Sequence, residues 1–218
     1  CCTEAFYGEM LGMEAGPRTE DDWRRLSDKQ LACAANGQIF KEGKGKFLEV
    51  RRTLLAYYPR TVWLQKIGVQ AALMAQSGQY NYPRLMMRRD SVGASLALGE
   101  FLKAAAGMCY LLNRVYMPYY KWIFRGMQDF ERLRDVADYM EELVRLPDQE
   151  EAWRGMSEED YRSFLNVRDY RVVYIETICR RVREELRVQG LSTCRDPFLE
   201  NHVQEILSHI GERQERRQ

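Results

Sequence analysis

The chain has 218 residues, of which 45% are hydrophobic and 30% are charged, so it can bury a core without disulfides or metal ions and is not largely disordered. Its 33 basic and 32 acidic residues leave a net charge of +1, which excludes a global electrostatic field for nucleic acid or anionic lipid. We therefore expect a globular protein with neither a nucleic-acid nor a membrane partner, and any such contact would have to be local.

The cysteines and the first residues favour a cytoplasmic location. The six cysteines form no Cys-x-x-Cys pair, and two histidines are too few for a zinc site of cysteine and histidine ligands. We therefore expect reduced thiols and no bound metal. Residues 1–4 lack the basic and apolar regions of a secretory signal. Because the chain begins with Cys1 instead of Met, we also expect that a preceding segment is missing.

Two capping boxes predict short helices near the start of the chain. Thr19 is followed three residues later by Asp22, and Ser27 is followed three residues later by Gln30. In each pair the first side chain can accept from the backbone of the first helical turn, and the second can reach back to the cap. We therefore expect one helix to begin after Thr19 and another after Ser27.

The glycine-rich segment 38–46 has no helical period and predicts a loop or a small hairpin. A helix from about 47 to 57 follows, and Pro59 ends it because the residue before a proline disfavours helical geometry. We expect residues 1–58 to form a helical and loop segment that packs on a larger bundle.

A long helix from about 90 to 116 is the predicted centre of the fold. Asp90 can cap its start, and apolar side chains recur every three or four residues along it. Within the apolar stretch Ser91–Leu112, a bilayer would penalise the charges of Glu100 and Lys103, so we expect a buried helix of a soluble protein. The predicted buried stripe is Ala94, Leu98, Leu102, Ala105, Cys109 and Leu112.

Helical patterns flank this element on both sides. The spacing from Pro59 to Ser77 predicts one helix, and the segment 78–83 is expected to be irregular. After the central helix, Pro118 can occupy the first turn of the next helix. Further helices are predicted at about 119–130, 133–143, 172–190 and 196–211, with an acidic amino-terminal turn at 157–160 and a frayed tail at 212–218. Without sustained strand alternation, the pattern predicts an all-α fold with a helical bundle over 59–211.

A first candidate site lies before the central helix. Arg84 and Arg88, with Arg89 beside them, precede the unsatisfied N–H groups of its first turn. Charge and helix dipole would act together on a phosphate or carboxylate there. The alternative is that these arginines pair with surface carboxylates.

A second candidate is a polar stripe on the central helix itself. Glu100, Lys103, Gly107, Tyr110 and Arg114 recur every three or four residues and therefore share one face. We expect this stripe to line a substrate groove in which Glu100 accepts a proton from a hydroxyl. The alternative is a solvent-facing pair of Glu100 and Lys103.

A third candidate is the turn that follows the central helix. Residues 113–122 carry an aromatic and cationic cluster that could stack on a base or sugar and bind an anion. The alternative is a corner held by aromatic packing. The predicted contact residues are Arg114, Tyr119, Tyr120, Lys121 and Trp122.

Other sequence patterns give weaker evidence for a functional site. His202, Glu205 and His209 share one face of the last helix without forming His-Glu-x-x-His, so we expect a solvated face. The sequence contains no phosphate-binding loop, no Gly-x-Ser-x-Gly and no Gly-x-Gly-x-x-Gly.

Three segments carry a resemblance to a known family: L-A-Y-Y-P-R-T-V-W-L (55–64), A-Q-S-G-Q-Y-N-Y-P-R (75–84) and L-N-R-V-Y-M-P-Y-Y-K-W (112–122). They resemble a bacterial family known as domain of unknown function four thousand and thirty-seven, over roughly residues 6–210. Its full-length members look like nucleotidyltransferases. They combine a half carrying a Gly-Ser motif and metal-binding aspartates with a helical half similar to the carboxy-terminal domain of kanamycin nucleotidyltransferases. This chain resembles the helical half.

The resemblance implies a substrate-binding part of an enzyme whose catalytic half is absent from this chain. Mg²⁺ and a nucleoside triphosphate would belong to the full-length protein, and no cofactor is expected on this chain alone, because it has no Gly-Ser followed by Asp-x-Asp. The implied partners are the amino-terminal transferase half and a small-molecule or nucleotide acceptor. Glu100 is the implied general base. The alternative function is a helical interaction module without chemistry of its own.

Overall fold

The structure is a computed structural model of the chain, and it describes residues 2–40, 45–156 and 166–211. Over these residues all regular elements are helices and no strand is formed, which confirms the all-α prediction. The middle of the expected hairpin, 41–44, lies outside the described residues, and the preceding residues 38–40 form no strand. The expected acidic turn at 157–160 and the tail at 212–218 also lie outside them.

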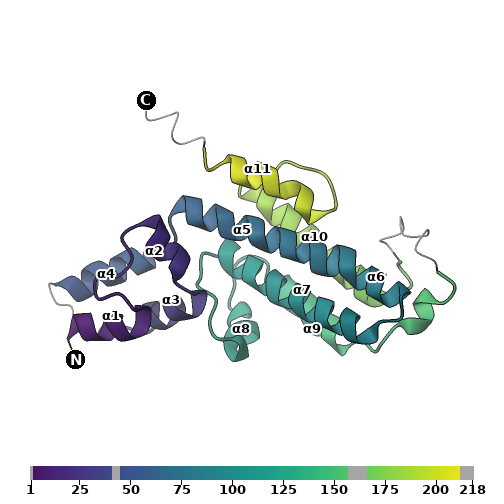
Figure 1. Cartoon of the computed structure of the whole chain (residues 1–218), viewed down its shortest axis with the longest axis horizontal. Helices are drawn as coiled ribbons and strands as arrows, with labels where there is room; N and C mark the ends of the chain where they lie inside the picture. Colours follow the sequence, from purple (N-terminus) through teal and green to yellow (C-terminus); the bar gives the residue numbers. More distant parts are fainter. Residues whose placement is uncertain (1, 41–44, 157–165, 212–218) are drawn as a thin grey trace.

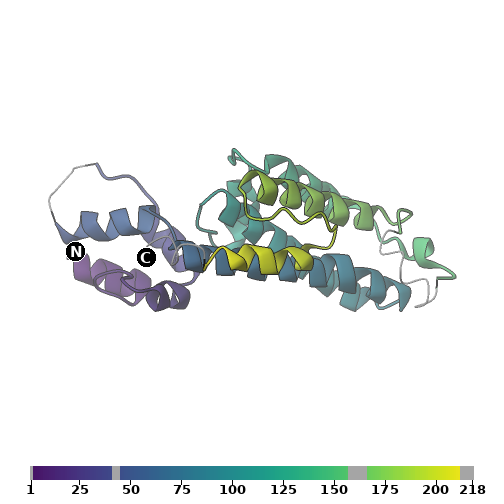
Figure 2. The same ribbon diagram turned by 90° about the horizontal axis from the view of Figure 1, so that it is seen from above.

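The amino-terminal helices lie together at one end of the molecule, as Figures 1 and 2 both show. Both predicted capping boxes are present: Thr19 and Asp22 start one helix, and Ser27 and Gln30 start the next. These helices are α1 (Thr3–Leu11), α2 (Glu20–Arg25), α3 (Asp28–Ala35) and α4 (Lys46–Leu55).

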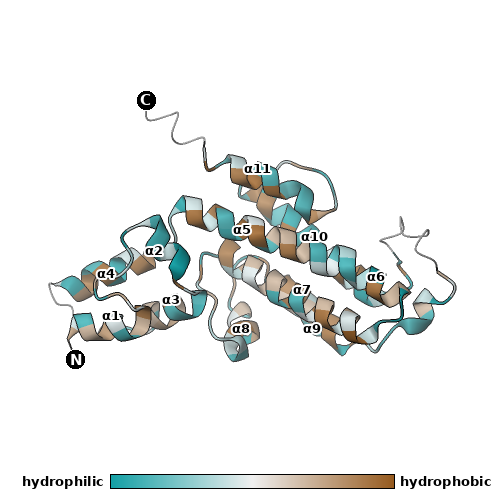
Figure 3. Cartoon of the chain, viewed as in Figure 1, coloured by the Kyte–Doolittle hydropathy of each residue, from teal (hydrophilic) through white to brown (hydrophobic). Residues whose placement is uncertain are grey.

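The remaining helices form a bundle around α7, which packs against α5, α6, α8 and α10. Apolar residues occur along most of α7 (Figure 3). The bundle contains α5 (Arg60–Met74), the π-helix η1 (Ala75–Asn81), α6 (Tyr82–Met87), α7 (Ser91–Leu112), α8 (Tyr120–Met127), α9 (Arg134–Arg145), the 3-10 helix η2 (Glu150–Trp153), α10 (Tyr170–Val188), the 3-10 helix η4 (Leu199–His202) and α11 (Val203–Ser208).

Among the described residues, α7 is the one helix long and apolar enough to cross a membrane by length and composition. However, 56% of its most apolar window is buried inside the protein, which is typical of the core helix of a soluble protein. The central position predicted for this helix is therefore confirmed.

The burial and the end of α7 differ from the prediction. Leu98 and Leu102 are only half-buried, and Val92 and Leu96 are exposed, because none of the helices among the described residues covers that side of the amino-terminal half. The helix ends at Leu112 instead of residue 116, and the next helix begins after Pro118, not around it. The predicted boundary was wrong because the backbone reverses immediately after Leu112.

The segment 78–83, predicted to be irregular, is helical. It continues α5 as η1, where the Tyr82 N–H donates to the carbonyl of Ser77, five residues back. This widened turn suits the sequence because Pro83 has no N–H for an ordinary helical bond. Packing also requires Gly78, since a Cβ there would lie 2.3 Å from Cδ2 of Phe101 in α7.

The widened turn also places a buried amide against the rest of the bundle. The Gln79 Nε2 donates to both carboxylate oxygens of Glu176 in α10, at 3.1 and 3.0 Å, and to the carbonyl of Pro197 at 3.0 Å. Its Oε1 accepts from the Leu199 N–H at 3.0 Å. Burial raises the pKa of Glu176. One glutamine therefore joins three segments that are distant in sequence.

The predicted solvated face around His202 was wrong. His202 is buried, with Nδ1 2.8 Å from the Ser192 hydroxyl and Nε2 2.9 Å from the carbonyl of Asp196. Glu205 accepts from the hydroxyl of Ser192 at 2.7 Å and from the N–H of Thr193 at 2.8 Å. His202 and Glu205 therefore attach the segment after α10 to η4 and α11. Helical spacing alone could not predict these contacts, because they join residues of different elements.

We expect Gly78→Ala to lower the free energy of unfolding by about 1–3 kcal/mol, because the added methyl group must displace Phe101. Gly99→Ala is the matched control, since a Cβ there meets no atom within 4 Å, and it should raise stability by up to about 1 kcal/mol. Urea denaturation of both variants measures the difference. Equal effects of the two substitutions would contradict the close packing at Gly78.

Glu205 predicts a pH dependence of stability. Its hydrogen bonds, chiefly from Ser192, lower its pKa from 4.5 to about 2. A lowered pKa in the folded state means that this stabilisation is present above pH 4.5 and is lost as the pH falls towards 2. Glu205→Gln should cost roughly 1–2 kcal/mol at pH 7 and reduce the loss of stability on acidification. Denaturation midpoints across this pH range test it, with the exposed Glu150→Gln as control; identical pH profiles for both variants would refute it.

Candidate ligand-binding site

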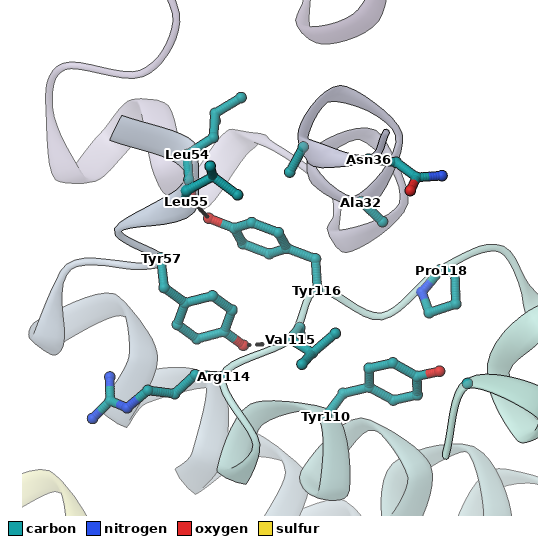
Figure 4. Close-up of a pocket in the computed structure, with 12 residues that line it drawn as sticks. Ala32, Asn36, Leu54, Leu55, Tyr57, Tyr110, Arg114, Val115, Tyr116 and Pro118 are labelled. Carbon is teal, nitrogen blue, oxygen red and sulfur yellow. Dashed lines mark hydrogen bonds between the residues drawn. The ribbon is translucent and has the colours of Figure 1, made fainter. Parts of the chain in front are cut away.

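A pocket of about 410 Å³ lies where the amino-terminal helices meet the carboxyl end of α7 (Figure 4). Small-molecule sites typically occupy about 300–1,000 Å³. Its walls come from α3, α4, α7, the following turn and α8. The lining residues are Ala32, Ala35, Asn36, Leu54, Leu55, Tyr57, Tyr110, Arg114, Val115, Tyr116, Pro118 and Gly126.

Three tyrosines contribute hydroxyl groups to the pocket wall, which also contains the amide of Asn36. The hydroxyl of Tyr57 donates to the carbonyl of Val115 at 3.3 Å, and that of Tyr116 donates to the carbonyl of Leu54 at 2.7 Å. The hydroxyl of Tyr110 donates to the carbonyl of Ile123 at 2.9 Å. Because each proton is already used, these oxygens offer a ligand only their lone pairs. The pocket therefore matches an apolar body that carries hydrogen-bond donors.

The same tyrosines stay protonated at neutral pH. Burial raises the pKa of Tyr110 to about 12 and raises the pKa values of Tyr57 and Tyr116 well above that of a free tyrosine. Proton abstraction by any of these phenols is therefore disfavoured. The tyrosine rings and hydroxyls can orient a ligand, and a catalytic base would have to come from elsewhere.

An aromatic cluster behind the pocket joins the amino-terminal helices to the bundle. The rings of Tyr57, Tyr58 and Tyr116 contact one another with centroids 4.8 to 5.1 Å apart. The Tyr58 hydroxyl donates to Asp28 at 2.6 Å, and Lys66 pairs with the same carboxylate at 3.2 Å. These contacts fix α3 against α5 and hold the pocket walls in place.

Two residues of the pocket wall have left-handed backbone geometry, with φ of 72° at Tyr57 and 54° at Arg114. At Arg114 the turn follows the Schellman pattern, because its N–H donates to the carbonyl of Leu111 and the N–H of Val115 donates to that of Tyr110. Glycine is the usual residue there, and another residue costs about 1–2 kcal/mol. Such strained positions concentrate at functional sites.

The Arg114 side chain is held outside the tyrosine rings. Its guanidinium lies 4.0 Å from the centroid of Trp63, whose indole N–H donates to the carbonyl of Leu111 at 2.9 Å. Figure 4 shows the Arg114 side chain extending away from Tyr57 and Tyr116. Arg114 also lines a second cavity of about 640 Å³ with Asn113, Arg132 and Gln189. Its cationic group therefore lies at the edge of the tyrosine pocket.

The predicted polar stripe is not a continuous groove. Tyr110 and Arg114 reach the pocket, whereas Glu100 and Lys103 are exposed and are not part of its wall. Gly107, between them, is buried against the side chain of Gln70. The face of α7 that is exposed to solvent at Glu100 is covered at Gly107 by Gln70 of α5. The predicted residues therefore do not share one continuous exposed surface.

The predicted anion-binding arginines lie at the other end of α7. Arg84 donates to the hydroxyl of Tyr80 and stacks over its ring at 4.2 Å, and Arg88 is exposed at the end of α6. The length of α7, about 33 Å at 1.5 Å per residue, separates these arginines from the pocket. They therefore belong to a different surface from Tyr110 and Arg114.

The aromatic residues after Pro118 lie outside the pocket as well. Tyr119, Tyr120, Lys121 and Trp122 are exposed at the start of α8. Among the described residues from Pro118 to the end of α8, only Pro118 and Gly126 contribute to the wall of the tyrosine pocket. The turn therefore presents two surfaces, an inner one at the pocket and an outer one on α8.

Sequence reasoning missed the wall from the amino-terminal helices. The sequence pattern marks Tyr57 as the end of a helix, and it assigns no site role to Ala32, Leu54 or Leu55. The pair Tyr57 and Tyr58 directly before Pro59 was the available signal, because adjacent aromatics in a chain reversal often pack against another element.

Residues 23–123 match the sequence profile of the family described as Domain of unknown function (DUF4037). The matched segment contains every residue of the pocket wall except Gly126, and is shorter than the span predicted from sequence. The match supports a relationship to this family over that segment. None of the curated proteins and none of the solved structures matches the chain. In the part of the chain that the structure describes, no group of three or more His, Cys, Asp or Glu side chains could hold a metal ion.

The left-handed backbone at Arg114 predicts that a glycine variant is more stable than an alanine variant at this position. Arg114→Gly should be more stable than Arg114→Ala by about 1 kcal/mol, because both lose the contact with Trp63 but only glycine removes the left-handed penalty. At the helical position Arg187, the order should reverse, since glycine weakens a helix relative to alanine. Chemical denaturation of the four variants checks this; alanine matching glycine at position 114 would contradict the strained geometry.

Proposed function

We propose that this chain is the helical acceptor-binding part of a nucleotidyltransferase-like protein, and that the tyrosine pocket holds the acceptor. The observation behind the proposal is the pocket between α3, α4 and α7, whose walls are mostly apolar and whose tyrosine hydroxyls offer lone pairs. An acceptor with hydroxyl or amino groups on an apolar framework matches that chemistry.

The catalytic metal site would come from another segment or subunit. Nucleotidyl transfer needs carboxylates that hold Mg²⁺ across the triphosphate, and the sequence has no Gly-Ser followed by Asp-x-Asp. Glu100 lies about 15 Å along α7 from Tyr110, at 1.5 Å per residue. A base role for Glu100 therefore requires an acceptor that extends out of the pocket along the helix.

The acceptor site is tested by filling the pocket from its edge. Leu55 lines the pocket yet is 60% exposed, so Leu55→Trp should block the pocket without disturbing the core. Leu96→Trp is the matched control, because Leu96 is 71% exposed on α7 and is not part of the wall. Saturation-transfer NMR with adenosine as the probe should detect binding that Leu55→Trp weakens by about tenfold, or about 1.4 kcal/mol, and that the control preserves.

Two outcomes would overturn the proposal. Binding that neither tryptophan variant changes would place the probe elsewhere, and the absence of adenosine binding would leave an interaction module as the better description. Nucleotide transfer by the purified chain alone, with Mg²⁺ and nucleoside triphosphates, would contradict the assignment of the catalytic groups to another segment.

A further inference from the structure

The outer face of α8, formed by Tyr120, Lys121, Trp122, Phe124 and Arg125, is a concentrated aromatic and cationic surface. Tyr120 is 72% exposed, Trp122 48% and Phe124 40%. On the opposite side of the helix, Met127 is buried and the carbonyl of Ile123 accepts from Tyr110. The aromatic residues of the outer face are therefore not required to fill the core of the bundle.

The cations of this face lie between the aromatic rings. Lys121 and Arg125 are one helical turn apart, and their charged groups lie 5.5 and 5.8 Å from the centroid of Trp122. At 100° per residue, Phe124 and Tyr120 lie on one side of this cationic ridge and Trp122 lies on the other. Lys29 of α3 adds a third cation nearby, 4.9 Å from the centroid of Tyr119.

The local charge differs from that of the whole chain. Within α8 itself the charged residues are Lys121 and Arg125, and the nearest acidic residues in sequence, Asp129 and Glu131, follow the end of the helix. The outer face of α8 is thus a local positive surface on a nearly neutral protein. It attracts an anionic partner at short range, where the Debye length of about 8 Å does not screen it.

We propose that the outer face of α8 binds single-stranded nucleic acid. Phosphates would lie along Lys121 and Arg125, and unpaired bases would stack on the exposed rings beside them. Aromatic stacking combined with backbone neutralisation is the general mode of single-strand binding. This assignment uses residues outside the tyrosine pocket and does not depend on the proposed acceptor site.

Two other anionic partners fit this face less well. An acidic peptide would satisfy the cations but leave the rings of Trp122 and Phe124 without a matching surface. An anionic membrane would require the aromatic residues to project furthest, whereas Lys121 and Arg125 occupy the centre of the outer face. Unpaired bases on a phosphate backbone match both the ridge and the rings.

The test is fluorescence anisotropy of the full chain with labelled oligouridylate and oligothymidylate of about 12 nucleotides, over a range of salt concentrations. Lys121→Gln combined with Arg125→Gln should weaken binding and make the slope of log affinity against log salt shallower by about 1.4, the value for two phosphate contacts. Arg168→Gln combined with Arg195→Gln removes the same charge from exposed sites outside α8 and should preserve both affinity and slope.

The aromatic contribution is measured separately. Trp122→Ala should lower affinity roughly five- to one-hundred-fold while leaving the salt slope unchanged, because stacking releases no counterions. Circular dichroism melting confirms that each variant remains folded. A duplex of the same length should bind more weakly than the single strands, since its bases are not free to stack.

Several results would overturn the assignment. These are no anisotropy change with either single strand, equal losses for the α8 and control variants, or duplex binding as tight as that of the single strands. A polyglutamate peptide that binds more tightly than the oligonucleotides would identify an acidic protein segment as the partner. Stronger binding to phosphatidylserine vesicles, lost with Trp122→Ala, would identify a membrane surface instead.

Discussion

The left-handed turn at Arg114 is the constraint on which the arrangement of this protein depends. It stops the central helix at Leu112 and sends the chain back, so that Tyr116 meets Tyr57 and Tyr58. Without this reversal, continuation of α7 would carry Tyr116 away from α4, whose Leu54 carbonyl it now binds. The energetic cost of a non-glycine residue at this position is offset by the stacking of its guanidinium on Trp63.

The tyrosine cluster turns that local reversal into a tertiary joint. Tyr57 and Tyr58 follow α4, the last of the amino-terminal helices, whereas Tyr116 follows the central helix, so their contacts fix the two parts against each other. Asp28 strengthens the joint because it accepts from Tyr58 and pairs with Lys66 of α5. Tyr57 and Tyr116 of this cluster also line the pocket, so the rings that join the two parts of the chain form part of its wall.

Local signals predicted part of this structure, and tertiary packing decided the rest. The capping boxes at Thr19 and Ser27 depend on side chains three residues apart, so the sequence was sufficient to identify them. By contrast, Gly78 and Pro83 indicate a break in the helix, and the chain remains helical because Gly78 must lie against Phe101. Tyr110 and Arg114, which helical spacing predicts on one face, both line the pocket, although Arg114 lies in the turn after α7. Tyr57 was not predicted, because it reaches the pocket through a contact with Val115, which is 58 residues further along the chain.

Gly126 explains how one short turn carries two surfaces. A Cβ at this position would lie 2.2 Å from the hydroxyl of Tyr110, so only glycine lets α8 approach closely enough for Tyr110 to donate to the Ile123 carbonyl. That hydrogen bond orients α8 with Met127 inward, and the cations and aromatic rings of its outer face are consequently turned to solvent. Because Tyr110 also lines the pocket, one phenol contributes both to the pocket wall and to the attachment of α8. The orientation of the outer face of α8 therefore rests on a residue of the pocket wall and on the glycine that contacts it.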